Sequence, residues 1–216
     1  MKALHLLFID FNDSFSFNII QCLKNLGHRV DILNHDRVDD YDLSLFSSYD
    51  IVVLGPGPGH IDDYPKFKKL LSYLLFKDEV LFLGICLGHQ FLGDQFGLQL
   101  QRLDSPLHGR SLSIDQSCDY LGIKKNDIKA MFYNSWTLKD TSPSENHFNI
   151  RVIWENEMVT IVETPLSLGL QFHPESVGTS CPILILDYAL SIVYNKSDER
   201  PNESNWALRP ANYSTS

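Results

Sequence analysis

The sequence predicts an α/β fold: an open, mostly parallel, twisted sheet flanked by helices, with extra short antiparallel strands in the second half. Two observations predict it. Over residues 4–97, apolar runs of strand length alternate with segments of helix length, as in parallel strands joined by helices. Over residues 98–172, short β-like segments follow one another and only polar turns separate them. The length of 216 residues suits one large domain with a cleft.

The first half supplies the expected parallel strands. Its apolar runs are typical of strands that are covered on both faces, and they span residues 4–9, 29–33, 50–54 and 80–85. A first helix is expected between a cap at Asn12 to Ser14 and a stop at Gly27. A second is expected over residues 65–77, with Phe67, Leu70, Leu71 and Leu74 on one face, and a third over residues 88–96, before Gly97.

The second half is expected to hold the short strands and a last helix. The β-like segments are residues 98–103, 110–114, 128–134, 149–155, 158–164 and 167–172. A helix over residues 180–194 is expected to pack back onto the core. From Asn195 the composition turns polar and charged. We therefore predict a domain over residues 1–194 and a polar tail over 195–216 that is mobile or contacts a partner.

Composition and charge exclude several classes of protein. Apolar residues make up 44% and charged residues 21%, which is ordinary for a globular protein. The net charge of −9, with no cluster of Lys and Arg, argues against a nucleic-acid partner. No apolar run reaches the roughly 18 residues that span a membrane, and the N-terminal stretch is better explained as a strand than as a signal peptide. The four widely spaced cysteines, without a CxxC pair, indicate a reduced cytoplasmic protein with neither disulfides nor a zinc site.

Residues 84–88, GICLG, place a cysteine between two glycines, after a predicted strand and before a predicted helix. This is the context of a nucleophile elbow, where glycines leave room for the adjacent strand and helix. The N-terminus of a helix also favours the thiolate. A free cysteine is more often a small buried hydrophobic residue, but such a residue needs no flanking glycines. Cys86 is therefore the candidate nucleophile.

Residues 170–176, LQFHPES, supply a candidate base. His173 follows an apolar strand, so we expect it at the carboxyl edge of the sheet, where open α/β folds keep their sites. Glu175 lies two residues further on and can turn back to bond the imidazole. A lone histidine is more often a satisfied surface or core group, and the chain has eight. Together with Cys86, however, these residues can complete a Cys–His–Glu triad.

Residues 54–60, LGPGPGH, form a glycine-rich loop directly after the third predicted strand. The phosphate-binding patterns G-x-x-x-x-G-K-[ST] and G-x-G-x-x-G do not fit it. One interpretation is a simple turn. The other is an oxyanion hole, in which an N–H of this loop and the N–H of Leu87 face the same ligand atom.

The GPG, GICLGHQ and QFHPES motifs, in this order and spacing, closely resemble those of the class I (triad-type) glutamine amidotransferases, over residues 4–194. The resemblance implies a flavodoxin-like fold and hydrolysis of L-glutamine to glutamate and ammonia, without a metal or an organic cofactor. It also implies that Cys86 is the nucleophile, His173 the base and Glu175 its orienting partner. By the same match, Gly57 and Leu87 supply the oxyanion N–H groups. The residues implied for the glutamine pocket are Gly55, Pro56, Gly57, Leu87, Gln90, Ser135 and Trp136.

Narrower features resemble the subunits that serve chorismate-using synthases, which make anthranilate or 4-amino-4-deoxychorismate. Residues 9–19, IDFNDSFSFNI, are similar to their opening motif, and residues 107–110, LHGR, to their H-G-K stretch. Phe11, Asn134 and Trp136 stand where that subgroup usually has Asn, His and Leu. The resemblance implies a hetero-oligomer with such a synthase. We prefer the anthranilate synthase partner, with the aminodeoxychorismate synthase partner as the alternative, although no motif residue separates the two.

Three other functions are weighed against this one. An α/β-hydrolase would place its acid before its histidine, whereas Glu175 follows His173. A flavodoxin-like binding module could use loop 12–18 for a phosphate, but that loop lacks the glycines that let N–H groups converge. A non-catalytic regulatory subunit would not need all three groups of a triad.

Overall fold

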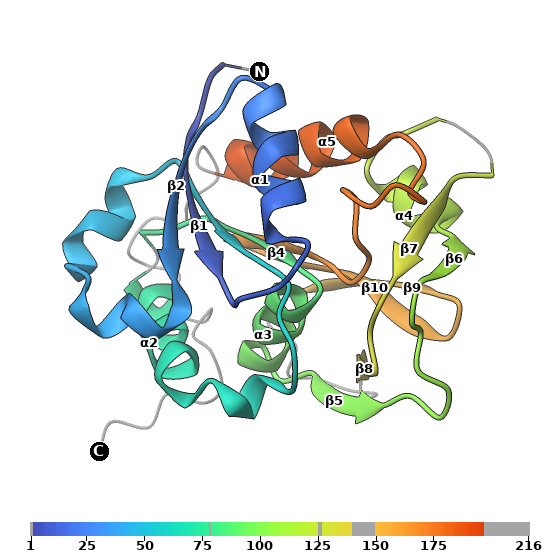
Figure 1. Ribbon diagram of the computed structural model, residues 1–216, viewed down its shortest axis with the longest axis horizontal. Coiled ribbons are helices and arrows are strands. Elements are labelled where there is room, and N and C mark those ends of the chain that lie inside the picture. Colours follow the sequence, from blue (N-terminus) through green and yellow to red (C-terminus); the bar gives the residue numbers. More distant parts are fainter. Residues whose placement is uncertain (1, 78, 125–126, 140–149, 197–216) are drawn as a thin grey trace.

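A computed structural model describes residues 2–77, 79–124, 127–139 and 150–196. Within these residues the main sheet has seven strands in the order β2-β1-β3-β4-β11-β10-β9 (Figure 1). The strands are β1 (His5–Asp10), β2 (Arg29–Asn34), β3 (Ile51–Leu54), β4 (Phe82–Ile85), β9 (Arg151–Glu155), β10 (Met158–Thr164) and β11 (Ser167–Leu170). The five strands from β2 to β11 in this order pair in parallel, and β10 and β9 continue the sheet in antiparallel pairs.

Two layers of helices cover this sheet (Figure 1). Helices α1 (Ser16–Asn25) and α5 (Pro182–Asn195) lie on one face, and α2 (Pro65–Lys77) and α3 (Leu87–Gln95) lie on the other. Alternate residues of each strand point to opposite faces, so one strand serves both layers. In β4, Leu83 and Ile85 pack toward α5, while Phe82 belongs to the core on the side of α2 and α3.

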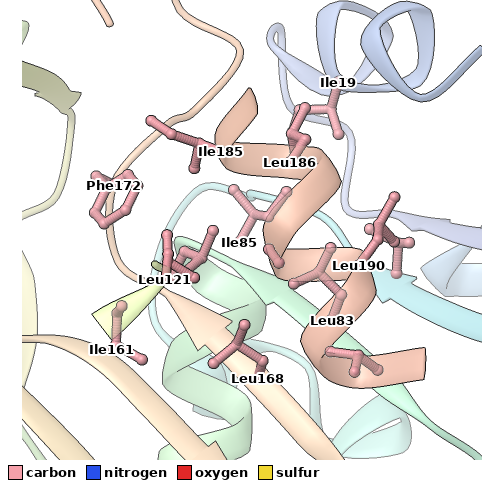
Figure 2. Packing of buried hydrophobic residues seen from close by; sticks show 14 of the residues in the cluster. Ile19, Leu83, Ile85, Leu121, Ile161, Leu168, Phe172, Ile185, Leu186 and Leu190 are labelled. Carbon is pink, nitrogen blue, oxygen red and sulfur yellow. The ribbon is translucent and has the colours of Figure 1, made fainter. Parts of the chain in front are cut away.

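The core beneath α5 joins strands that are distant in the sequence. Figure 2 shows Ile85 of β4 and Leu168 of β11 beside Leu186 and Leu190 of α5, and all four are fully buried. Because this packing fixes β4 against β11, it also fixes the loops that follow the two strands. These loops carry Cys86 and His173.

Shorter elements frame one end of the sheet. Two antiparallel ribbons are formed by β5 (Gln99–Arg102) with β8 (Trp136–Lys139) and by β6 (Arg110–Ser113) with β7 (Lys129–Phe132). The remaining helices are α4 (Asp115–Tyr120) and the 3₁₀ turns η1 (His35–Asp40), η2 (Leu43–Ser48) and η3 (Ile61–Asp63). No helix of the described residues is long and apolar enough to cross a membrane.

The predicted fold class is confirmed: a mostly parallel open sheet flanked by helices, with small antiparallel additions. The predicted helix 65–77 agrees with α2 residue for residue. The predicted cap of the first helix is wrong, because α1 begins at Ser16 after Phe15 and no side chain caps it. The Asp13 carboxylate instead accepts the N–H of Phe15 in the turn before the helix.

Helix α4, strand β8 and the 3₁₀ turns were not predicted. The predicted strand over residues 149–155 corresponds to β9, Arg151–Glu155, and its first residue lies outside the described residues. Of the predicted tail, Asn195 ends α5 and Lys196 follows it, whereas residues 197–216 lie outside the described residues.

Candidate active site

Cys86 lies on the sharp turn between β4 and α3. Its backbone angles, φ 54° and ψ −101°, are unusual for a residue other than glycine, and such strain persists only where surrounding contacts enforce it. Two hydrogen bonds do so here. The N–H of Cys86 donates to the carbonyl of Leu170 at 2.8 Å, and its carbonyl accepts from the N–H of Gln90 at 3.1 Å. The turn therefore has the geometry predicted for a nucleophile elbow.

The glycines on either side of Cys86 allow this turn to pack closely. A Cβ atom on Gly84 would lie 2.6 Å from the carbonyl carbon of Gly88 and 2.7 Å from the backbone nitrogen of His89. A Cβ atom on Gly88 would overlap the carbonyl oxygen of Leu54 in β3. Since backbone atoms cannot move aside cheaply, both positions require glycine. The two glycines of the G-x-C-x-G pattern are therefore needed for the close contact of α3 with β3 and β4.

His173 follows β11, three residues after the strand ends. Its N–H donates to the carbonyl of Met131 in β7 at 2.9 Å, and its carbonyl accepts from the Thr179 hydroxyl at 2.7 Å. The imidazole is buried and its Nδ1 lies 2.7 Å from Oε1 of Glu175, whose side chain is also buried. The rings of Phe15 and Tyr133 lie against the imidazole, with centroids 5.3 and 5.0 Å away. These two rings also contact each other, with centroids 4.6 Å apart, so together with Glu175 they hold the imidazole in place.

Contacts with Cys86 and Glu175 determine the protonation of His173. Burial acts strongly to lower the pKa of the imidazole, but the interactions with Cys86 and with the hydrogen-bonded carboxylate of Glu175 outweigh it and raise the pKa to about 10. At neutral pH His173 is then an imidazolium beside the Cys86 sulfur. This arrangement places a proton donor next to the sulfur, whereas Nδ1 is committed to Glu175.

The N–H groups of Gly57 and Leu87 belong to the two segments beside Cys86. Within the described residues, neither donates to a backbone or side-chain acceptor. The loop that holds Gly57 is joined to α3, because the N–H of Gly88 donates to the carbonyl of Gly55 at 3.2 Å. Both N–H groups can therefore bind an oxygen atom of a ligand.

A cavity of about 400 Å³ opens next to Cys86. The lining includes the predicted residues Gly57, Leu87, Gln90, Ser135 and Trp136. Gly55 and Pro56, which we also predicted in the pocket, are buried and do not line the cavity. The backbone of Gly55 is bonded on both sides, to Ile9 and to Gly88, so this residue lies in the support of the loop.

Two hydrogen bonds position the side chain of Gln90 in the cavity. Its Nε2 donates to the carbonyl of Trp136 at 2.9 Å and to Oε1 of Gln171 at 3.2 Å. Gln171 in turn directs its own Nε2 at Sγ of Cys86, 3.8 Å away. Gln171 was not predicted, although it stands two residues before His173 in the same motif.

Further residues of the cavity were also not predicted. They are Asp13, Pro58, Gly59, Arg102, His108, Tyr133 and Asn134. Tyr133 and Asn134 adjoin a predicted pair and could have been inferred from their position. Arg102 reaches the cavity because it pairs directly with Trp136 across the β5–β8 ribbon. In the described residues no group of three or more His, Cys, Asp or Glu side chains could hold a metal ion.

The fold and this site define a class of protein: an α/β protein with a cysteine on a strained strand-to-helix turn, a carboxylate-held histidine and two unbonded N–H groups beside one cavity. Comparison with known proteins is more specific. The sequence profile of the family Glutamine amidotransferase class-I matches residues 7–187. The chain belongs to this enzyme family.

Two curated relatives are similar over nearly their whole length. The Aminodeoxychorismate/anthranilate synthase component 2 of Bacillus subtilis (strain 168) is 31% identical over 180 residues, or 81% of this chain and 90% of the relative. The Anthranilate synthase component 2 of Saccharolobus solfataricus is 32% identical over 194 residues, or 83% and 94% of the two chains.

A solved structure of a glutamine amidotransferase from Thermotoga maritima has the same fold, with a TM-score of 0.57 and 17% identity, and the match covers 97% of this chain and 89% of that one. A solved structure from Methylobacillus flagellatus, a glutamine amido transferase, matches with a TM-score of 0.61 and 14% identity over 95% and 98% of the two chains.

Proposed function

We propose that this protein is the glutaminase subunit of a chorismate-using synthase. It hydrolyses L-glutamine to glutamate and ammonia and passes the ammonia to the synthase. The observation that carries the proposal is the pairing of a strained, buried Cys86 with a His173 whose pKa is raised to about 10, beside an open cavity. The triad in this proposal is Cys86, His173 and Glu175.

The first half of the reaction forms a thioester. The Cys86 thiolate attacks the side-chain amide carbon of glutamine, and the N–H groups of Gly57 and Leu87 bind the oxygen that becomes negatively charged. The His173 imidazolium donates its Nε2 proton to the amide nitrogen, and the C–N bond breaks to release ammonia. Glu175 holds Nδ1 and stabilises the imidazolium until the proton leaves.

The second half hydrolyses the thioester. His173, now neutral, accepts a proton from water as the water oxygen attacks the thioester carbon. The C–S bond then breaks, which releases glutamate and restores the thiolate beside an imidazolium. Side chains and water supply every group in this scheme, so the proposed half-reaction uses no metal or organic cofactor. Gln90, Ser135 and Trp136 are proposed to hold the amino-acid end of glutamine.

The relatives support the choice of partner. Two of them are named as component 2 of anthranilate synthase or of a dual aminodeoxychorismate/anthranilate synthase. A second component that receives ammonia is consistent with a glutamine-hydrolysing site that, in the described residues, holds Cys86 and His173 beside one cavity. We prefer anthranilate synthase, and aminodeoxychorismate synthase is the alternative, because the Bacillus subtilis relative is named for both.

The test mixes the full chain with each candidate synthase, chorismate and glutamine, and follows anthranilate and aminodeoxychorismate separately. We expect one product, and its identity names the partner. With Cys86→Ser the same complex should form product only when ammonium salts are supplied at raised pH, because the synthase then needs no glutamine hydrolysis.

The matched control is Cys22→Ser, which removes the half-buried thiol of α1 and should retain activity with glutamine. Full glutamine-dependent activity in Cys86→Ser contradicts the triad. If neither chorismate product forms while another ammonia acceptor is aminated, the assignment of the partner is wrong but the triad stands.

A further inference from the structure

The loop that carries Gly57 has little regular structure to hold it. Residues 55–59 contain two prolines, which have no N–H to donate. Within the described residues, a single side chain hydrogen-bonds the backbone of residues 55–59: the Tyr64 hydroxyl donates to the carbonyl of Pro58 at 2.7 Å. Tyr64 is 9% exposed, and burial chiefly raises the pKa of its hydroxyl, so it remains a donor at neutral and mildly alkaline pH.

Aromatic packing holds the same loop from behind. A Cβ atom on Gly57 would lie 2.6 Å from Cβ of Phe11 and 2.5 Å from Cδ2 of Leu87, so the Gly57 backbone is enclosed between these two side chains. Phe11 is fully buried and its ring meets Tyr64 edge-on, with centroids 5.3 Å apart. Phe91 of α3 stacks against Phe11 at 5.4 Å. Tyr64 therefore contacts the loop through its hydroxyl and the support of the loop through its ring.

Charged contacts fix the turn that leads into Tyr64, which directly follows η3. Nζ of Lys68 in α2 lies 3.0 Å from Oδ1 of Asp62 in η3 and 3.1 Å from Oδ2 of Asp94 in α3. The N–H of His60 donates to the carboxylate of Asp63 at 2.7 Å and closes the other end of the turn. The hydroxyl thus projects from a short segment that is tied to the helix behind Cys86.

We propose that Tyr64 is a positioning residue, whose hydroxyl holds the 55–59 loop so that the N–H of Gly57 faces the reacting atom at Cys86. The inference rests on the proposed function for its chemical meaning. An oxyanion donor is effective only within a narrow range of position, and a loop without regular structure does not supply that precision by itself. Tyr64 acts through the loop and does not contact the reacting atoms.

The test compares Tyr64→Phe with the wild-type full chain. The variant keeps the ring and loses only the hydroxyl. We expect kcat for glutamine hydrolysis with the synthase to fall about five- to tenfold, the effect of one neutral hydrogen bond, with KM within about twofold. Alkylation of Cys86 by iodoacetamide should stay within about twofold, because that reaction forms no oxyanion. Hydrogen exchange at the amides of His60 and Gly88, whose N–H groups donate to Asp63 and to the carbonyl of Gly55, should become several-fold faster.

The matched control is Tyr41→Phe, which removes another tyrosine hydroxyl hydrogen bond, 2.8 Å from the hydroxyl of Tyr49. It should leave the kinetics of glutamine hydrolysis, the alkylation of Cys86 and the hydrogen exchange of the loop unchanged. Unchanged exchange in Tyr64→Phe overturns the proposal whether or not the protein hydrolyses glutamine. Faster exchange with an unchanged kcat also overturns it, because the loop would then not position the donor. If the wild type does not hydrolyse glutamine with any synthase, the proposed function fails, and exchange alone decides whether Tyr64 holds the loop.

Discussion

Glu175→Gln tests the roles of the proposed triad most directly. The substitution keeps the size of the side chain and removes the charge that Nδ1 of His173 meets at 2.7 Å. Both side chains are buried, so water cannot replace the lost interaction. A hydrogen bond between charged groups contributes about 1.5–3 kcal/mol, and about 1.4 kcal/mol changes a rate tenfold. We therefore expect kcat/KM for glutamine to fall about ten- to a hundredfold.

The pH profile gives a second measure of the same change. In the proposed mechanism the imidazolium of His173 gives a proton to the leaving ammonia, and its raised pKa keeps it protonated up to a pH of about 10. Wild-type kcat/KM should therefore fall only as the pH rises through about 10. Removing the carboxylate lowers the pKa of His173, so in Glu175→Gln this alkaline limb should move down by about one to two pH units. The measurement is glutamate release by the full chain with its synthase between pH 6 and 10.5.

Glu155→Gln is the matched control. Glu155 is as buried as Glu175, but its carboxylate accepts the N–H groups of Gln116 and Ser117 at the start of α4. Its substitution should lower stability and leave the pH profile unchanged. His173→Ala should be the more severe lesion, because it removes the proton donor itself. If Glu175→Gln reduces kcat/KM more than His173→Ala, or if its alkaline limb does not move, our assignment of the two roles is wrong.

Three further outcomes are expected. Cys86→Ser should lower glutamine hydrolysis by at least about a thousandfold, measured as glutamate release, since a hydroxyl is a far poorer nucleophile than the sulfur that it replaces; near-wild-type hydrolysis would exclude Cys86 as the nucleophile. Iodoacetamide should label Cys86 before Cys118, because burial raises the pKa of the Cys118 thiol to about 12, and peptide mapping that finds equal labelling argues against an activated Cys86. Gly84→Ala should reduce the free energy of unfolding in urea by about 3 kcal/mol or more, because the new Cβ meets only backbone atoms at 2.6–2.7 Å. A loss below about 1 kcal/mol would mean that the elbow can relax.

The sequence predicts well those features that local pattern determines. The strands of the central sheet are continuous apolar runs, since helices cover both faces, and this pattern identifies β1, β3 and β4 to within one or two residues. The elbow at Cys86 was likewise predictable, because the two glycines answer a steric demand that lies within five residues. His173 and Glu175 were found because they are only two residues apart.

Features that depend on distant pairing were not predictable. Strand β8 begins at Trp136 in a polar segment, and it exists because it pairs with β5, more than thirty residues earlier in the chain. The same pairing brings Arg102 to the cavity, where no sequence motif indicates it. Helix α4 has too few residues to show a period, and the buried Glu155 carboxylate accepts the N–H groups of its first turn. In each case a long-range contact supplies what the local sequence lacks.

The order of three neighbouring strands explains how the parts of the site come together. In the sheet, β4 lies between β3 and β11, and Ile85 is in register with Leu170. The loop after β3 carries Gly57, the turn after β4 carries Cys86, and the segment after β11 carries His173. The hydrogen bond from the N–H of Cys86 to the carbonyl of Leu170 both supports the strained turn and ties it to the strand that leads to His173. A displacement of β11 would therefore disturb Cys86 and His173 together, so we expect the packing of α5 on β4 and β11 to be required for the proposed catalysis as well as for folding.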